Sequence, residues 1–251
     1  MQFCRVQLTP DMLPSDVIGV TVFDREGSTF RFKPGPIFAN IILADEINRT
    51  TPRTQTALLE AMSDASVSVD GVAHELPAPF TVLATQNPYE FEGTYLLPEN
   101  QLDRFLMRIS LGYPEASAEA DMLDIRPAQT RLTELEAVMT AEDILDIQNA
   151  VDAVAIAPEL RTYIVNLATA TRQTEELEVG LSPRGSLALA QAARATALMA
   201  GRDYTTPADI FENLSPVCAH RIIVRGAAAG VGWKRAAAAL DEIAQSVDAP
   251  R

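Results

Sequence analysis

The feature that most constrains the fold is a short apolar run that leads directly into two acids, NIILADE at residues 40–46. A continuous apolar run of this length is typical of a parallel strand that is buried on both faces of an α/β sheet. Asp45 and Glu46 come at its carboxyl end, which is where ligands bind in open α/β sheets. The run therefore predicts an α/β fold with a ligand site at these two acids.

Other segments in the first part of the chain also predict strands and turns. Two alternating stretches with Glu-Gly and Asp-Gly turns predict hairpins, VTVFDREGSTFRFKPG at 20–35 and VSVDGVAHEL at 67–76. A helix is predicted at 51–65, capped by Thr51 with Pro52 in its first turn. Three further strands are predicted, at FCRVQL (3–8), FTVLATQN (80–87) and FLMRISL (105–111).

After Tyr113-Pro114 the pattern changes to helical periodicity with almost no strand signal. Two Thr-x-x-Asp capping boxes support helix starts there. They lie at Thr140/Asp143 and Thr206/Asp209. We therefore expect an α/β domain at residues 1–113 and a helical domain at 114–251.

The composition excludes several classes of protein. The chain of 251 residues has 20 basic and 34 acidic residues, a net charge of −14, so we expect no broad binding to nucleic acid or anionic membrane. No apolar run approaches the roughly 20 residues that span a bilayer. Cys4 and Cys218 have no neighbours at metal-ligand spacing, so a cytoplasmic protein without a disulfide framework is expected.

The acids suit nucleotide hydrolysis if the strand ending in Asn87 lies parallel to the one ending in Asp45. An acid can hold Mg²⁺, a second acid can polarise the attacking water, and the amide of Asn87 can hold that water in line. The alternative is that Asp45 and Glu46 simply end a strand and cap the next segment of the chain.

Two arginines give this site a wider context. Arg104 lies just before the predicted strand at 105–111. Arg184 falls in the first turn of a helix with Ser182 as cap and Pro183 at its first position. A cation at that end is disfavoured by the helix dipole, so Arg184 suggests an anion nearby. For either arginine alone, a solvated or salt-bridging surface role is the other reading.

Taken together, these segments closely resemble the MoxR-type AAA+ ATPases over nearly the whole chain. The resemblance is carried by five segments. They are RVQLTPDMLPSDVIG, GPIFANIILADEINRTTPRTQTALLEAM, FTVLATQNPYEFEGTYLLPENQLDRFLMRI, GLSPRGSLALAQAARATALMAGRDYTTPADI and the HRI at 220–222.

The resemblance implies a role for each site residue. Asp45 would serve Mg²⁺ and Glu46 the hydrolytic water, as the Walker B acids. Asn87 would be the sensor 1 residue. Arg104 would be the arginine finger that reaches a neighbouring subunit's nucleotide, and Arg184 the sensor 2 residue near the γ-phosphate.

The resemblance also implies an architecture and partners. The family has a P-loop NTPase core with sheet order 5-1-4-3-2 and a helical lid, binds ATP and Mg²⁺, and forms rings that are commonly hexamers. The hairpin at 67–76 falls at the helix-2 insert. Members remodel or mature other proteins in a chaperone-like way, often beside a protein with a von Willebrand factor A domain.

One family motif is absent from these residues, the phosphate loop G-x-x-x-x-G-K-[ST]. The two lysines, Lys33 and Lys234, do not close such a loop. We therefore expect the chain to lack strand 1 and to be inactive alone. A gene start placed too late, a fragment, or a non-hydrolysing subunit that lends Arg104 to a ring remain open.

Overall fold

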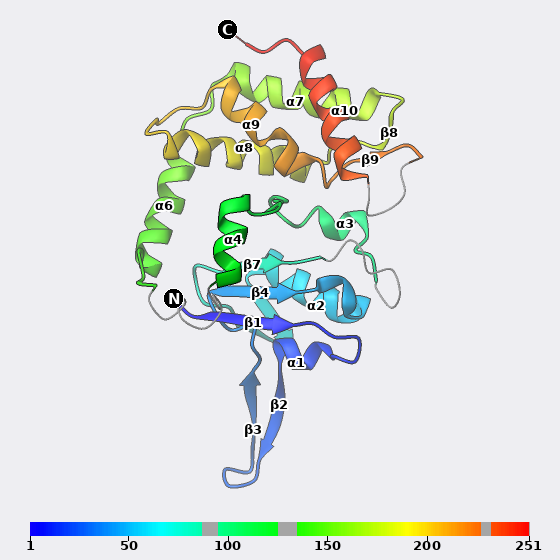
Figure 1. Cartoon of the computed structure of the whole chain (residues 1–251). Helices are drawn as coiled ribbons and strands as arrows, with labels where there is room; N and C mark the ends of the chain where they lie inside the picture. The colour runs from blue at the N-terminus through cyan, green and yellow to red at the C-terminus, as the bar shows by residue number, and fades with distance from the viewer. Residues whose placement is uncertain (87–94, 125–134, 227–231, 251) are drawn as a thin grey trace.

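The structure is a computed structural model that describes residues 1–86, 95–124, 135–226 and 232–250. An α/β part is followed by a helical part, as predicted (Figure 1). The first part is built on three parallel strands in the order β1-β4-β7. These are β1 (Phe3–Gln7), β4 (Ile41–Asp45) and β7 (Thr81–Ala84).

The central strand β4 confirms the predicted parallel strand, because it is hydrogen-bonded on both edges, but only one of its faces is fully buried. Ile42 and Ala44 are fully buried on one face of the sheet. That face packs into a core with Leu8, Ile37, Leu58 and Leu59. On the other face Phe3 is 63% and Leu83 50% exposed, so this face is only partly covered.

Two helices bring the chain back from one parallel strand to the next, as parallel pairing requires: α1 (Pro14–Ile18) lies between β1 and β4, and α2 (Pro52–Asp64) lies between β4 and β7. Two short helices follow β7, α3 (Glu99–Leu102) and α4 (Ala116–Asp124). The predicted start of α2 is confirmed, since the Thr51 side chain accepts a hydrogen bond from the Thr54 N–H and Pro52 is its first residue.

Both predicted hairpins are present. β2 (Gly19–Asp24) pairs with β3 (Thr29–Pro34), and this long hairpin projects away from the body (Figure 1). β5 (Ser66–Val69) pairs with β6 (Val72–Glu75). Asp70 and Gly71 both have positive φ, as the tight turn of a two-residue hairpin requires.

The predicted strand at 105–111 is wrong, because the structure has no strand there. A strand needs a neighbour to accept its backbone hydrogen bonds. Here the backbone is bonded to the helical part instead. The N–H of Arg108 donates to the carbonyl of Pro216 at 2.8 Å, and the carbonyl of Phe105 accepts from the side chains of His220 and Arg221.

The second part is largely helical, as predicted, with one short two-stranded ribbon that the sequence pattern did not indicate. Both capping boxes are formed. Its helices are α6 (Ala141–Ala153), α7 (Pro158–Gln173), α8 (Pro183–Met199), α9 (Pro207–Cys218) and α10 (Trp233–Ser246), and its ribbon is β8 (Leu177–Val179) with β9 (Ile223–Val224).

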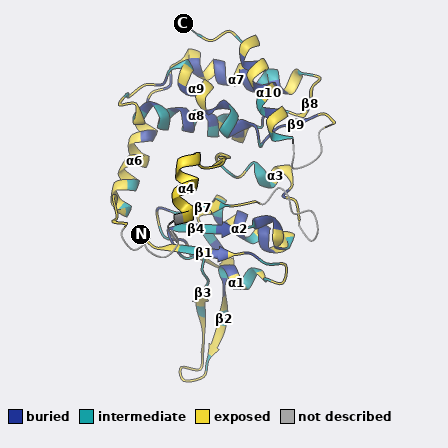
Figure 2. Cartoon of the chain, in the orientation of Figure 1, coloured by how far each residue is buried: buried dark blue, intermediate teal, exposed yellow. Residues whose placement is uncertain are grey.

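This part has its own apolar core, separate from that of the sheet (Figure 2). Leu167, Leu189, Ile210, Leu214 and Leu240 are at most 2% exposed and come from four different helices. Within the described ranges, no helix is long and apolar enough to cross a membrane.

Candidate functional site

Asp45 and Glu46 lie where β4 leaves the sheet. Asp45 is the last residue of the strand and aligns with Gln7 of β1. Glu46 then adopts a left-handed conformation (φ 55°, ψ 54°) and turns the chain into a short 3₁₀ helix. A non-glycine residue in this region is uncommon and costs conformational energy, which the surrounding contacts must offset. The turn leaves both acids at the carboxyl edge of the sheet.

The carboxylate of Asp45 is held from both neighbouring strands. One oxygen accepts a 2.5 Å hydrogen bond from the hydroxyl of Thr85, which follows β7. The other oxygen accepts from Nε and Nη2 of Arg5 on β1, at 3.1 and 2.5 Å. The hydrogen bond from Thr85, followed by that from Arg5, lowers the pKa of Asp45 below its usual value. Asp45 is therefore ionised at neutral pH.

The carboxylate of Glu46 has separate partners. It accepts from the side-chain amide of Gln7 at 3.0 Å and from the guanidinium of Arg49 at 2.9 Å. Its own N–H donates to the hydroxyl of Thr85 at 2.8 Å. The single hydroxyl of Thr85 thus joins the Asp45 side chain to the Glu46 backbone.

These donors suit a hard divalent cation. Mg²⁺ prefers oxygen ligands and is usually bound by one or two carboxylates together with waters and substrate phosphates. Asp45, Glu46 and Thr85 offer two carboxylates and a hydroxyl at one edge. Among the described residues, no group of three or more His, Cys, Asp or Glu side chains could form a complete protein cage. The donor set therefore fits Mg²⁺ that arrives with a phosphate ligand.

Asn87 lies outside the described residues, so its meeting with Asp45 and Glu46 stays a prediction. The strand that leads to it is described, however. β7 is the parallel neighbour of β4, from Ile41 opposite Thr81 to Ala44 opposite Ala84. Thr85, two residues before Asn87, is already in contact with both acids.

Arg104 lies just after α3 and is exposed. Its Nη1 donates to the carbonyl of Leu59 at 3.2 Å and to the hydroxyl of Ser63 at 2.6 Å. Both acceptors lie toward the C-terminal end of α2, where the helix dipole favours a cation. In the free chain Arg104 therefore rests on the end of α2 rather than on Asp45 or Glu46.

Arg184 is exposed in the first turn of α8, as predicted. Ser182 caps this helix by accepting from the N–H of Gly185 at 3.0 Å, and Pro183 is its first residue. The Ser182 hydroxyl also donates to the carboxylate of Asp103, the residue before Arg104. This contact ties the start of α8 to the segment that carries Arg104.

The two arginines consequently line one groove, a cavity of about 920 Å³ between α7, α8 and residues 103–106. Asp45 and Glu46 are not among its lining residues. Its other arginines are Arg161, Arg172, Arg194 and Arg221, against the single acid Asp103. Of the predicted site residues that the structure describes, Arg104 and Arg184 thus line this basic groove, and Asp45 and Glu46 lie at the acidic edge of the sheet outside its lining.

A buried ion pair fixes the groove to the sheet domain. The side chain of Arg221 is 2% exposed and pairs with Asp103 at 2.8 Å. It also donates to the backbone carbonyls of Asp103, Phe105 and Leu106. His220 contacts the Phe105 carbonyl at 3.1 Å, and burial lowers the pKa of His220 to about 4. The HRI segment therefore anchors the chain on either side of Arg104.

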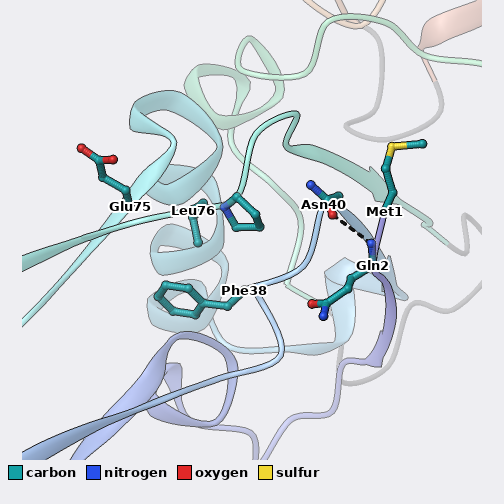
Figure 3. A pocket seen from close by; sticks show the side chains of 7 residues that line it. Met1, Gln2, Phe38, Asn40, Glu75 and Leu76 are labelled. Carbon is teal, nitrogen blue, oxygen red and sulfur yellow. Dashed lines mark hydrogen bonds between the residues drawn. The ribbon is translucent and has the colours of Figure 1, made fainter. Parts of the chain in front are cut away.

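A second cavity, of about 620 Å³, lies at the opposite end of the sheet (Figure 3). It is bordered by Gln2, Phe38 and Asn40, before the first residues of β1 and β4. Asn40 accepts from the N–H of Gln2 at 2.8 Å and donates to the carbonyl of Pro79 at 3.0 Å. Its polar groups are thus used in joining strand starts, and ligands of such sheets bind at the other end.

Arg5, Gln7, Thr85 and Arg221 were not predicted as parts of a site. Alternation could have indicated the first two, since residues 5 and 7 of a strand beside β4 share the face of Asp45. Thr85 could have been indicated by its place at the end of a neighbouring strand. Nothing in the local pattern around Arg221 indicated burial, because arginine is mostly exposed.

Comparisons with known proteins identify a family for both parts of the chain. Residues 1–107 match the family model described as ATPase family associated with various cellular activities (AAA), and residues 169–243 match the AAA lid domain. A crystal structure of a protein assigned as an ATPase from Cytophaga hutchinsonii ATCC 33406 is similar with a TM-score of 0.86 and 35% identity. The match covers 99% of this chain and 78% of that one.

Sequence relatives extend the same result. The uncharacterized protein YeaC of Bacillus subtilis (strain 168) is 47% identical over 99% of this chain and 77% of its own length. Chaperone MoxR1 of Mycobacterium tuberculosis is 39% identical over 88% of this chain, and this chain spans 61% of its length. Protein MoxR of Methylorubrum extorquens is 34% identical over 88% of this chain and 71% of its own length.

Proposed function

The chain belongs to the MoxR-type AAA+ ATPases, a family of ATP hydrolases, and from this premise we propose that Asp45 and Glu46 are its hydrolytic centre. Asp45 would hold Mg²⁺, which supplies charge neutralisation for the nucleotide phosphates when bound. Glu46 would accept a proton from the attacking water, and Asn87 would orient that water. The observation that carries the proposal is the Thr85 hydroxyl. It donates to the ionised carboxylate of Asp45 and accepts from the N–H of Glu46, so it holds both acids at one place.

Tight nucleotide binding needs more than this edge. A phosphate loop supplies a cradle of backbone N–H groups, a lysine for the phosphates and a hydroxyl for Mg²⁺. The 251 residues contain no such motif, and the relatives extend beyond the part that they share with this chain. We propose that the hydrolysing form is an extended form, meaning this chain together with in-frame residues that supply the loop.

Arg104 and Arg184 are assigned to a neighbouring subunit's nucleotide. Both are exposed, both line the basic groove, and neither contacts the acidic edge of its own chain in the described residues. An arginine that reaches a neighbour's γ-phosphate stabilises the charge that develops during phosphoryl transfer. Because Arg184 shares the groove with Arg104, we place both in trans, within a ring that is a hexamer.

The biological role follows the family and is likewise proposed. ATP turnover would drive chaperone-like remodelling or maturation of a partner protein in the cytoplasm, together with a protein that has a von Willebrand factor A domain. MoxR1 is named a chaperone, which supports this role. The β2–β3 hairpin projects furthest from the body, so we assign the pore-facing role of the helix-2 insert to it in place of β5–β6 (Figure 1).

A second candidate is a non-hydrolysing subunit that joins a ring and lends Arg104 to its neighbour. The observation in its favour is the absent phosphate-loop motif in a chain whose Arg104 and Arg184 are exposed. The two candidates differ in Glu46, which only a hydrolysing subunit uses.

ATP turnover of the extended form tests the proposal through Glu46→Gln. We expect turnover to fall by about 100-fold or more, because the general base is lost. Glu60→Gln makes the same chemical change at an exposed position of α2 and should leave turnover unchanged. The 251-residue chain alone should show no turnover. Equal turnover in the Glu46→Gln variant and the parent would remove Glu46 from the mechanism.

A further inference from the structure

Arg5 occupies the side of Asp45 that faces β1. Arg5 is aligned with Leu43 of β4, two residues before Asp45. Because side chains two residues apart on a strand share a face, the Arg5 side chain lies on the same sheet face as the Asp45 carboxylate. Two of its nitrogens bond to one oxygen of Asp45, at 3.1 and 2.5 Å. Nη2 also bonds to Gln7 at 3.3 Å. The guanidinium is thus aimed at one carboxylate oxygen.

Both oxygens of Asp45 are taken in this state, one by Arg5 and the other by Thr85. A divalent cation that bound Asp45 would need one of these oxygens at roughly 2.1 Å. It would also meet the positive charge of Arg5 a few ångströms away, and like charges at that distance repel. Arg5 therefore competes with a divalent cation for the Asp45 carboxylate.

The exposure of Arg5 indicates that this contact can be exchanged. Its side chain is 60% exposed, whereas that of Asp45 is 18% exposed. An exposed guanidinium can leave its partner at small cost, since surface ion pairs contribute little. The buried pair of Arg221 and Asp103 is the opposite case, because Arg221 is 2% exposed and has four further acceptors.

We propose that Arg5 is a positioning residue that serves as the exchangeable counter-cation of Asp45. Without nucleotide it neutralises and orients the carboxylate, and it opposes binding of a divalent cation on its own. When the cation arrives with phosphates, Arg5 releases Asp45. The inference rests on the proposed function of Asp45 as a cation ligand.

The test measures Mn²⁺ binding to the 251-residue chain without nucleotide, because Mn²⁺ accepts the same carboxylate and water ligands as Mg²⁺. Free Mn²⁺ is followed by electron paramagnetic resonance. Arg5→Gln should bind Mn²⁺ about fivefold or more tightly than the parent, because a unit charge about 4 Å away is removed. Arg5→Lys keeps the charge and should stay near the parent.

Two controls separate this effect from others. Arg235→Gln removes one positive charge from an exposed position of α10 and should leave Mn²⁺ affinity at the parent value. In Arg5→Gln/Asp45→Asn the gain should disappear. Circular dichroism and thermal unfolding of each variant check that the fold is kept, as the exposure of Arg5 leads us to expect.

The outcomes distinguish the role of Arg5 from the proposed role of Asp45 as a cation ligand. If Arg5→Gln gives no gain while Asp45→Asn weakens Mn²⁺ binding, the role of Arg5 is overturned and Asp45 remains a cation ligand. If neither substitution changes Mn²⁺ binding, the assignment of Asp45 is overturned as well. A gain in Arg5→Gln that persists with Asp45→Asn would also overturn the inference.

Discussion

The hydroxyl of Thr85 donates a 2.5 Å hydrogen bond to the carboxylate of Asp45 across two neighbouring strand ends. The same oxygen accepts from the Glu46 N–H at 2.8 Å. A small side chain on the strand that leads to Asn87 therefore positions both acids. A movement of that strand would shift Asp45 and Glu46 directly. Thr85 therefore connects the two acids to the strand that leads to Asn87.

Replacing Thr85 with Val keeps the shape of the side chain and removes the hydroxyl. We expect the pKa of Asp45 to rise toward its ordinary value, because the largest cause of its lowering is gone. A carboxyl with a lowered folded pKa stabilises the fold above its unfolded pKa and loses that effect as pH falls through the folded pKa. The Thr85→Val variant should therefore lose less stability in acid than the parent.

Carboxyl NMR titration of Asp45 measures this shift, and Thr85→Ser is the matched control because it keeps the hydroxyl. The free energy of unfolding at pH 7 should fall by about 1 kcal/mol in Thr85→Val. An unchanged Asp45 titration in that variant would show that the hydroxyl does not hold the carboxylate.

The sequence predicted the central strand well, and the reason is physical. An apolar run such as 41–44 favours an interior strand of a parallel sheet, and the acids that follow it then lie at the sheet edge. Helix starts were also predictable, because Thr51, Ser182 and the two capping boxes use local hydrogen bonds. Helix caps depend on residues that are close in the sequence, so the sequence alone can predict them.

Contacts between distant segments were not predictable in the same way. The strand expected at 105–111 has apolar residues in a suitable pattern, yet a strand forms only beside a partner. Its backbone bonds to His220, Arg221 and Pro216, more than 100 residues away. Likewise, the separation of Arg104 and Arg184 from Asp45 follows from packing between the two parts, which no local pattern encodes.

The ion pair between Arg221 and Asp103 should be costly to break. In Arg221→Met the Asp103 carboxylate and four backbone carbonyls lose their buried donor. We expect the free energy of unfolding to fall by about 3–5 kcal/mol. Chemical denaturation at pH 7 measures this.

Arg225→Met is the control, since Arg225 is exposed and its side chain donates to the Glu175 carbonyl at 3.0 Å. It should cost about 1 kcal/mol or less. Similar losses in both variants would contradict the anchoring role of Arg221.

His220 should make the fold sensitive to mild acid. Burial lowers its folded pKa to about 4, so between that value and its unfolded pKa the unfolded chain binds more protons. The stability that depends on a neutral His220 is present at pH 7 and is lost as the pH falls below about 6.5, where the imidazole of the unfolded chain becomes protonated. Between pH 7 and pH 5 the parent should lose about 2 kcal/mol more stability than His220→Gln. Parallel denaturation curves at the two pH values measure the difference, and an equal pH dependence in both proteins would contradict it.

The most direct test of the account mixes two variants of the extended form, Glu46→Gln and Arg104→Ala. Each alone should have little ATP turnover, because one lacks the base and the other the arginine. If Arg104 acts in trans, a 1:1 mixed ring places an intact Glu46 beside a neighbour's intact Arg104 at about a quarter of its interfaces. Ser63→Ala serves as the control, since it removes one of the two resting contacts of Arg104 and leaves the guanidinium intact.

We predict that the mixture recovers about a quarter of the parent turnover, while Ser63→Ala keeps full turnover. A mixture that forms mixed rings and yet stays as inactive as its two components would contradict it. Arg104 would then act within its own subunit, and the separation of the acidic edge from the basic groove would not reflect how the site works.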